Sequence, residues 1–170
     1  MKKILLSLIV SASLIACTNQ ETKIDGQTVP TNATGYTIDS SANTDLVKRS
    51  SNALANNDTI EYRNTYSSNV VFHDNNDSQN LTQNMVGIKA MFDKGIVWKL
   101  NKFEAIWETV YKKANEKGVS NYVNSYSNFT LTKGGKSINV IFSVVDAIKD
   151  GKQVEEWLVY DKSGIAELMK

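Results

Sequence analysis

The stretch from Val97 onward constrains the fold most, because apolar and polar residues alternate there with a period of two. The alternating runs are Val97–Tyr111, Asn121–Thr132, Ser137–Lys149 and Gln153–Tyr160. Gly-Gly at 134–135 and Asp-Gly at 150–151 are strong hairpin turns between runs, and Glu-Lys-Gly at 116–118 is a weaker one. Four long strands joined by hairpins predict an antiparallel sheet.

A helical pattern precedes these strands. The first helix is predicted to begin near Asp39 or Ser41, since either side-chain oxygen can cap a helix, and to end at Asn-Asn-Asp 56–58. Its apolar face carries Leu46, Val47, Ser50, Ala53 and Leu54. A second, short helix is predicted from Thr59 to about Tyr66.

A short strand and a third helix follow. Val70–His73 is predicted to be a strand, closed by a turn at 74–77. The third helix is indicated by apolar residues at helical spacing and ends at Gly95. These residues are Met85, Ile88, Met91 and Phe92. The order predicts an α+β fold in which three N-terminal helices pack in a strongly curved, mixed but mainly antiparallel sheet.

Four segments carry a resemblance to a known family. They are Ala-Leu-Ala-Asn-Asn-Asp at 53–58, Val-Val-Phe-His-Asp at 70–74, Gly-Ile-Lys-Ala-Met-Phe at 87–92 and the final strand and turn at 156–166. In order and spacing they resemble the SnoaL-like branch of the nuclear-transport-factor-2-like superfamily, over about residues 40 to 170. The resemblance implies a cone-shaped, cystatin-like roll whose cavity, between sheet and helices, holds a substrate or ligand.

The resemblance does not supply an activity. Similar folds include polyketide cyclases, ketosteroid isomerases and epoxide hydrolases, which use a cavity carboxylate with tyrosine, histidine or other polar partners. Those catalytic sets do not match this sequence residue by residue, and a fold alone does not confer a function.

The N-terminus has the zones of an export leader. Two lysines form a charged start, and the apolar run Ile4–Val10 is too short to span a bilayer. Leu-Ile-Ala-Cys at 14–17 resembles the bacterial lipobox, which implies cleavage before Cys17 and acylation of that residue. We therefore expect residues 1–16 to be a lipoprotein signal peptide and Cys17 to anchor the protein to a membrane.

The residue after the cysteine bears on localisation. In a Gram-negative cell, Thr18 at this position resembles the pattern sorted to the outer membrane. Cys17 is the only cysteine, so an exported protein can form no internal disulfide and depends on packing for its stability.

Residues 17–38 are rich in Thr, Asn, Gln and Gly and are predicted to form the lipidated cysteine and a flexible tether. The alternative is an ordered N-terminal arm that lies on the domain, helped by Val29, Tyr36 and Ile38. The folded domain is predicted over residues 39–170.

The charge of the mature chain argues against nucleic acid as a partner. The whole chain has 19 basic and 18 acidic side chains, and loss of the two leader lysines leaves 17 basic ones, scattered among acids. The sequence has no Gly-rich phosphate loop, nucleophile elbow or zinc-helix motif, so no cofactor is predicted. A single histidine makes a multi-histidine metal site impossible, and no metal site is predicted.

Aromatic residues on the strands are the predicted cavity wall. Alternation places Phe103, Ala105 and Trp107 on one face of the first long strand and more charged residues on the other, which we expect to face solvent. The candidate wall residues are Trp98, Trp107, Tyr126 and Trp157. Ordinary core packing is the alternative for each.

Ionisable strand residues are the catalytic candidates. His73 and Asp74 are neighbours that could supply a general base, although successive strand residues point to opposite faces and need not meet. Burial in the cavity would raise the pKa of a carboxyl group and fit it for acid or base chemistry. The strand carboxylates that could enter the cavity are Glu104, Glu108, Asp146, Glu155 and Glu156.

Three functions fit the sequence. We prefer a non-catalytic, lipid-anchored domain that holds a small, largely apolar molecule. The second is an enzyme of SnoaL-like type, a cyclase, isomerase or hydrolase that uses a cavity carboxylate or His73. The third is an envelope interaction module that forms a homodimer through the outer sheet face, as members of the resembling family commonly do.

Overall fold

The computed structural model describes residues 21–24, 27–30 and 34–170. Glu21–Ile24 (β1) and Gln27–Pro30 (β2) form a two-stranded antiparallel hairpin in a unit of its own. The second unit, from Thr34 to Lys170, is the globular domain. The predicted signal peptide at 1–16 and Cys17 lie outside the described residues, so the lipid anchor stays a prediction.

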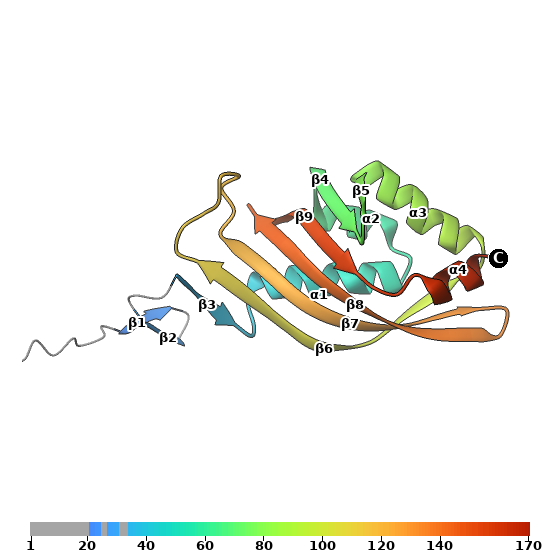
Figure 1. The fold of residues 1–170 in the computed structure, drawn as a ribbon, viewed down its shortest axis with the longest axis horizontal. Helices are drawn as coiled ribbons and strands as arrows, with labels where there is room; N and C mark the ends of the chain where they lie inside the picture. The colour runs from blue at the N-terminus through green and yellow to red at the C-terminus, as the bar shows by residue number, and fades with distance from the viewer. Residues whose placement is uncertain (1–20, 25–26, 31–33) are drawn as a thin grey trace, which may run out of the picture. The chain divides into compact units, whose positions relative to one another are not determined.

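The domain combines one sheet with helices that precede, interrupt and follow its strands along the chain (Figure 1). In chain order they are β3 (Gly35–Ile38), α1 (Ala42–Ala55), α2 (Thr59–Thr65), β4 (Tyr66–Asp74), β5 (Asp77–Asn80), α3 (Leu81–Asp93), β6 (Val97–Tyr111), β7 (Asn121–Lys133), β8 (Lys136–Lys149), β9 (Lys152–Val159) and α4 (Ser163–Met169). The α+β class is confirmed. Three N-terminal helices are not found, because β3 precedes the helices and β4 and β5 separate α2 from α3. The short helix α4 was not predicted.

Seven strands form one mixed sheet in the order β3-β6-β7-β8-β9-β4-β5. Every pair is antiparallel except β4 with β9, which is parallel. Gly134 and Gly135, like Asp150 and Gly151, have positive φ at both positions, as a tight type I′ hairpin turn requires. The predicted hairpins β7–β8 and β8–β9 are therefore confirmed.

The first strand of the domain falls inside the segment assigned by sequence to the tether. β3 pairs with the end of β6, from Gly35 opposite Tyr111 to Ile38 opposite Glu108. Ile38 is buried, which gives this segment an apolar anchor on the domain. The sheet thus begins a few residues before the predicted boundary at 39, as the alternative of an ordered arm anticipated for Ile38.

Local capping explains where the main helices begin. Ser41 caps α1 through a reciprocal pair of hydrogen bonds with Thr44, and Asn80 caps α3 in the same way with Gln83. Gly95, two residues after α3, adopts the left-handed conformation that ends many helices. None of the described helices is long and apolar enough to cross a membrane.

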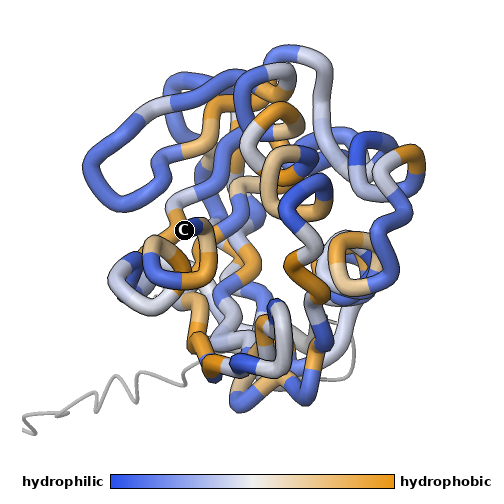
Figure 2. The backbone as a smooth tube through the Cα atoms, turned by 90° about the vertical axis from the view of Figure 1, so that its right-hand side faces the viewer, coloured by the Kyte–Doolittle hydropathy of each residue, from blue (hydrophilic) through white to orange (hydrophobic). Residues whose placement is uncertain are grey.

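The helices cover one face of the sheet, which we call the inner face, and the opposite face is the outer face. Hydrophobic and hydrophilic residues alternate along the strands and helices, as the end-on view in Figure 2 shows. On β7, Val123, Phe129 and Leu131 are buried on the inner face. The helix α4 closes one end of this core, where Ile165 and Met169 pack beside Met91 of α3.

Candidate functional site

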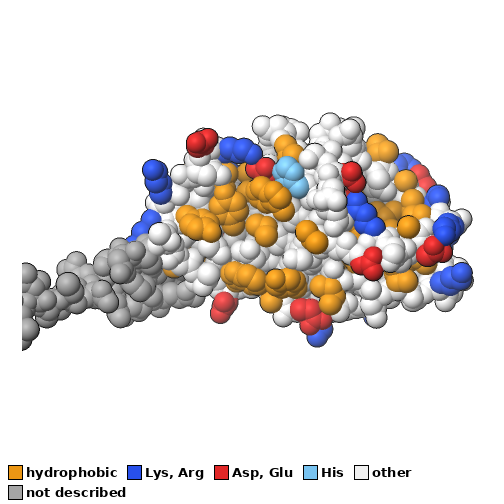
Figure 3. Space-filling model, viewed as in Figure 1, with side chains coloured by type: hydrophobic (Ala, Val, Ile, Leu, Met, Phe, Trp, Pro, Cys, Tyr) orange, Lys and Arg blue, Asp and Glu red, His pale blue; other side chains and the backbone are white. Residues whose placement is uncertain are grey.

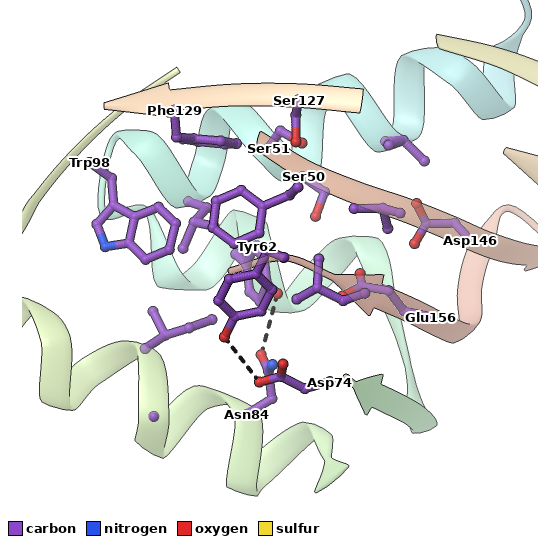
Figure 4. A pocket seen from close by; sticks show the side chains of 18 of the residues that line it. Ser50, Ser51, Tyr62, Asp74, Asn84, Trp98, Ser127, Phe129, Asp146 and Glu156 are labelled. Atoms are coloured by element: carbon purple, nitrogen blue, oxygen red, sulfur yellow. Dashed lines mark hydrogen bonds between the residues drawn. The ribbon is translucent and has the colours of Figure 1, made fainter. Parts of the chain in front are cut away.

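A cavity of about 270 Å³ lies between the inner face of the sheet and the helices. Residues of α1, α2, α3 and α4 form its helical side, and the strands from β4 to β9 supply the strand side. Carboxyl groups of Asp146 and Glu156 gather at one end, and the rings of Trp98 and Phe129 lie at the other (Figure 4). The cavity is therefore amphipathic.

Strand register brings the two deepest carboxyls together. Asp146 of β8 is directly opposite Glu156 of β9, and the inner row continues to Val123 of β7 and Phe72 of β4. Like charges directly opposite each other on a sheet are destabilising. A sequence that folds in this register must therefore relieve the repulsion within the pair.

The burial of Asp146 makes that repulsion severe. Asp146 is 1% exposed and Glu156 is 7% exposed. No described N–H or O–H group donates a hydrogen bond to either carboxyl oxygen of Asp146. Burial, together with the charge of Glu156, raises the pKa of Asp146 well above its usual range. A proton on Asp146 would relieve this repulsion.

Glu156, unlike Asp146, has a hydrogen-bond donor beside it. The Tyr66 hydroxyl donates to Glu156 Oε2 at 2.7 Å and accepts from Ser50 Oγ at 3.2 Å. Burial raises the pKa of Glu156 overall, and the hydrogen bond from Tyr66 offsets part of that rise. The pKa of Asp146 is raised more strongly, so Asp146 is the member of the pair that holds a proton more tightly.

A second polar cluster lies along the cavity wall. The Tyr160 hydroxyl donates to Asp74 Oδ2 at 3.3 Å, and the Tyr62 hydroxyl donates to Asn84 Oδ1 at 3.3 Å. Figure 4 shows Tyr62, Asn84 and Asp74 close together. Burial and the neighbouring Asp74 raise the pKa of Tyr160, which keeps its hydroxyl neutral and able to donate.

The opposite wall is aromatic. Trp98 packs edge-to-face on Phe129, with ring centroids 5.6 Å apart, and stacks on Phe142 at 5.8 Å. Its indole Nε1 is buried with no hydrogen-bond partner among the described residues. This wall offers apolar contact to a ligand body and bounds the cavity with rigid side chains.

The charge of the cavity has one sign. Its described lining residues include three acids, Asp74, Asp146 and Glu156, and no Lys, Arg or His. Lys162 reaches Asp74 Oδ1 at 3.4 Å from a more exposed position, but it does not line the cavity. The Asp146 and Glu156 pair thus has no cationic partner in the cavity wall.

Of the four aromatic residues predicted to form the wall, Trp98 lines the cavity and the other three do not. Trp107 and Tyr126 lie on the outer face with ring centroids 6.1 Å apart. One of positions 98 and 107 is even and the other odd, and the two one-residue shifts in β6 together restore the alternation, so Trp98 and Trp107 lie on opposite faces. Trp157 belongs to the same outer row as Trp107 through the paired residues of β7 and β8.

In the second half of β6, residues of the more charged set point inward, contrary to the sequence expectation, whereas Lys102 and Glu104 of that set are exposed. Ile106 packs on the buried Val123, and Glu108 is only 2% exposed. Glu108 tolerates burial because the side-chain amides of Asn43 and Asn121 donate to its Oε1 at 2.7 Å and 2.5 Å. A charged residue can therefore occupy an inner position when polar side chains from other segments donate hydrogen bonds to it.

His73 and Asp74 face opposite sides of the sheet. Asp74 lines the cavity, whereas His73 stacks on Trp157 with ring centroids 5.3 Å apart on the outer face. His73 Nε2 lies 2.9 Å from Glu155 Oε1, which also belongs to the outer face. Asp74 is thus available to a cavity ligand, and His73 is not.

The structure distinguishes among the five candidate strand carboxylates. Asp146 and Glu156 line the cavity; Glu108 is buried outside its lining; and Glu104 and Glu155 make ion pairs with Lys102 and Lys117. Within the described part of the chain, no group of three or more His, Cys, Asp or Glu side chains could hold a metal ion.

Several site residues were not identified from the sequence. Tyr66, Ser50, Tyr62 and Tyr160 form the hydrogen-bonded surroundings of the acids. Alternation along β8 could have indicated that Asp146 points inward, because Asp146 lies an even number of residues from the apolar Val140, Phe142 and Val144. No local signal pointed to Tyr66, because its partner Glu156 lies 90 residues away.

Comparison with known proteins bears on the fold. No protein-family model matches the sequence, and comparison with curated protein sequences finds no significant match. Among solved structures, an epoxide hydrolase of M. tuberculosis aligns with a TM-score of 0.56 at 15% identity, covering 75% of this chain and 89% of that one.

Two further structures align equally well. A proposed polyketide cyclase of Xanthomonas campestris has a TM-score of 0.55 at 12% identity, covering 76% of this chain and 97% of that one. An NTF2-like protein of unknown function from Burkholderia pseudomallei has a TM-score of 0.56 at 13% identity, covering 77% and 99%. The resemblance seen in the sequence is confirmed at the level of the fold: the described domain has a nuclear-transport-factor-2-like fold.

Proposed function

We propose that the protein binds a small, largely apolar molecule in this cavity and that Asp146 and Glu156 transfer protons to and from it. The proposal rests on this pair, because two buried carboxyls that share one proton provide an acid and a base at the same place. Groups whose surroundings separate their pKa values in this way are typical of acid–base catalysis.

The geometry gives each carboxyl a role. Asp146 holds a proton and has no other protein partner, so it can donate to a substrate oxygen or nitrogen. Glu156, oriented by Tyr66, is the carboxylate that accepts a proton from substrate. After one such exchange the pair again holds one proton. The apolar wall around Trp98 makes the surroundings of the pair less polar, which strengthens these electrostatic interactions.

Fold neighbours support small-molecule chemistry as the functional class. One aligned structure is an epoxide hydrolase and another is a proposed polyketide cyclase. The similarity lies in the fold, and the case for proton transfer in this chain rests on its own carboxyl pair.

A generic proton-transfer substrate can test the pair without knowledge of the natural ligand. In 5-nitrobenzisoxazole, a base removes the proton on C3, the C–H electron pair forms the nitrile, and the ring N–O bond breaks to release a coloured phenolate. We expect the purified protein to accelerate this reaction and Glu156→Gln to lower the rate by about 100-fold, the usual contribution of a general base. Phenolate absorbance gives the rate.

The control uses the neighbouring outer-face carboxylate. Glu155→Gln removes a carboxylate one residue away, on the side of the sheet opposite to the cavity, and should leave the rate unchanged. A rate that does not respond to Glu156→Gln, or that responds equally to Glu155→Gln, would contradict a role for the cavity pair.

We also propose that Cys17 anchors the protein to the cell envelope, in the outer membrane if the cell is Gram-negative. The charged start, apolar run and Leu-Ile-Ala-Cys sequence of the leader support this proposal. Cells grown with an alkyne-tagged fatty acid should label the wild-type protein and not Cys17→Ser. Label on both proteins would show that acylation does not occur at this residue.

A homodimer through the outer face is a further proposal, supported by an apolar surface. Tyr126, Ile141 and Val159 are exposed and lie on the outer side of β7, β8 and β9. The space-filling view in Figure 3 shows hydrophobic side chains and the single described histidine across this face.

Sedimentation tests the dimer. The wild-type protein should sediment as a dimer, Ile141→Lys should sediment as a monomer, and the control Val86→Lys, on α3, should remain a dimer. A monomeric wild-type protein would refute the proposal.

A further inference from the structure

We propose that the molecule bound in this cavity is an organic amine, with its ammonium group at Asp146 and Glu156 and its apolar body against Trp98 and Phe129. The inference rests on the proposed function of the cavity and names the class of its ligand. It stands on the sign of the cavity's charge, on an unpaired buried carboxyl and on the aromatic wall at the opposite end (Figure 4).

A negative charge on the carboxyl pair has no cationic partner in the cavity wall. The described cavity lining contains Asp74, Asp146 and Glu156 and no Lys, Arg or His. A buried charge without a partner is costly, and a ligand that supplies the opposite charge removes that cost. A carboxylate ligand would add like charge at the same place and should be rejected.

The hydrogen-bonding groups at this end also match an ammonium. Both Asp146 oxygens are buried and receive no hydrogen bond from a described donor, and Glu156 receives one from Tyr66. An ammonium group has three donors and no acceptor, so it complements the two carboxyls in their ionised, acceptor-only form. A neutral alcohol has a single donor and brings no charge.

The far wall selects the body of the ligand. Trp98, Phe129 and Phe142 contact one another and present aromatic surface to the cavity. The volume of about 270 Å³ fits a single ring with a short side chain better than a fused polycyclic body. We therefore expect a primary amine on a small aromatic or alicyclic skeleton.

Three probes with one skeleton separate charge from shape. They are 2-phenylethylamine, 2-phenylethanol and 3-phenylpropionate, each titrated into the purified full chain by calorimetry at neutral pH. We expect the amine to bind at least about tenfold more tightly than the alcohol, a difference that one charge-assisted interaction readily supplies, and the carboxylate not to bind. Amine binding should also release protons from the pair, which titration in buffers of different ionisation enthalpy detects.

Variants locate the selectivity. Asp146→Asn has nearly the same shape and should reduce the preference for the amine over the alcohol to less than about threefold. Glu156→Gln removes the other carboxyl of the pair and should reduce the preference in the same way. The matched control is Glu155→Gln, which removes a carboxylate from the outer face of the same strand and should retain the full preference. Far-UV circular dichroism establishes that each variant is folded.

The outcomes separate the ligand class from the proposed function. An alcohol or carboxylate that binds as tightly as the amine, or an amine preference that survives both cavity substitutions, overturns the amine inference. Absence of binding by all three probes also overturns it. In each case the nitrobenzisoxazole reaction, whose substrate is uncharged, still reports whether the carboxyl pair transfers protons.

Discussion

The inner and outer faces of the sheet carry similar residues in opposite surroundings. The inner face has a carboxyl pair, Asp146 and Glu156, and a tryptophan, Trp98. The outer face has Glu155 beside His73, and it has Trp107 and Trp157. Inside, the acids lack a cationic partner, whereas outside Glu155 Oε2 lies 2.7 Å from Lys117 Nζ.

The difference shows how one position along a strand decides the chemistry of a side chain. Glu155 and Glu156 are adjacent in sequence, yet their pKa values move in opposite directions. Burial raises the pKa of Glu155, but hydrogen bonds from Lys117 and His73 outweigh it and lower the pKa overall. Burial dominates for Glu156, whose pKa is raised. Alternation places one residue near solvent and cations and the other in a closed, acidic cavity.

The largest expected effect compares two tryptophans of the same strand. Trp98→Ala should lower the free energy of unfolding by about 3–5 kcal/mol, because it empties a packed site beside Phe129. Trp107→Ala should cost about 1 kcal/mol, the loss of one aromatic contact with Tyr126 on the outer face. Urea denaturation measures both. Equal losses in a monomeric protein would contradict the assignment of the faces.

A smaller effect is expected from two tyrosines. Tyr66→Phe should lower the free energy of unfolding at neutral pH by about 1–3 kcal/mol, because the buried Glu156 carboxyl loses its hydrogen-bond donor. Tyr126→Phe, on the exposed outer face, should change it by less than about 0.5 kcal/mol. Urea denaturation at fixed pH measures both variants. An equal loss of stability in Tyr126→Phe and Tyr66→Phe would contradict a special role for the buried hydroxyl of Tyr66.

The two acids should give opposite dependences of stability on pH. The pKa of Asp146 is raised by folding, so its contribution is present at low pH and is lost as pH rises from about 4, the unfolded value, through the raised folded value. The lowered pKa of Glu155 gives stability that is present above the unfolded value and is lost as pH falls through the folded one.

Asp146→Asn should therefore raise the free energy of unfolding at neutral pH by about 1 kcal/mol and flatten the decline toward alkaline pH. Glu155→Gln should instead flatten the decline toward acid. Thermal unfolding followed across pH separates the two variants. A loss of stability in Asp146→Asn at neutral pH would show that the buried carboxyl is not destabilising.

The smallest effect concerns the helical wall of the cavity. Gly87 lies inside α3 and lines the cavity, and a Cβ built there meets no atom within 4 Å. Gly87→Ala should therefore raise the free energy of unfolding by about 0.5–1 kcal/mol through helix propensity alone. Urea denaturation checks it. A decrease would indicate that the helix needs a residue without a side chain at this position.

Much of the fold followed from local sequence. The four long strands, the two glycine turns after 133 and 149, and the helix that begins after Ser41 are present close to their predicted bounds. Their signals lie within a few residues of one another, since capping, turn geometry and periodicity are local interactions. β3, β5 and α4 are short, and their stability comes from distant partners such as β6 for β3.

The candidate site was only partly accessible to sequence reasoning. Asp146 and Glu156 were among five candidate carboxylates, and Trp98 was among four aromatics, but nothing local ranked them. From the sequence, the aromatic side chains of Trp107 and Trp157 were expected on the inner face and the charged side chain of Glu108 on the outer face. Both expectations were wrong. On the outer face Trp107 and Trp157 pack against neighbouring rings, which reduces the cost of exposure. On the inner face amide groups donate hydrogen bonds to Glu108, which reduces the cost of burial.

The sequence by itself determined the class of fold, the order of the long strands and the residues available for chemistry, because these depend on neighbours along the chain. Only the tertiary structure decided which strand face meets the helices, and it alone placed Asp146 opposite Glu156 under the hydroxyl of Tyr66. Strand register and helix docking join residues that are far apart in the chain. The chemistry of the cavity depends on those long-range contacts.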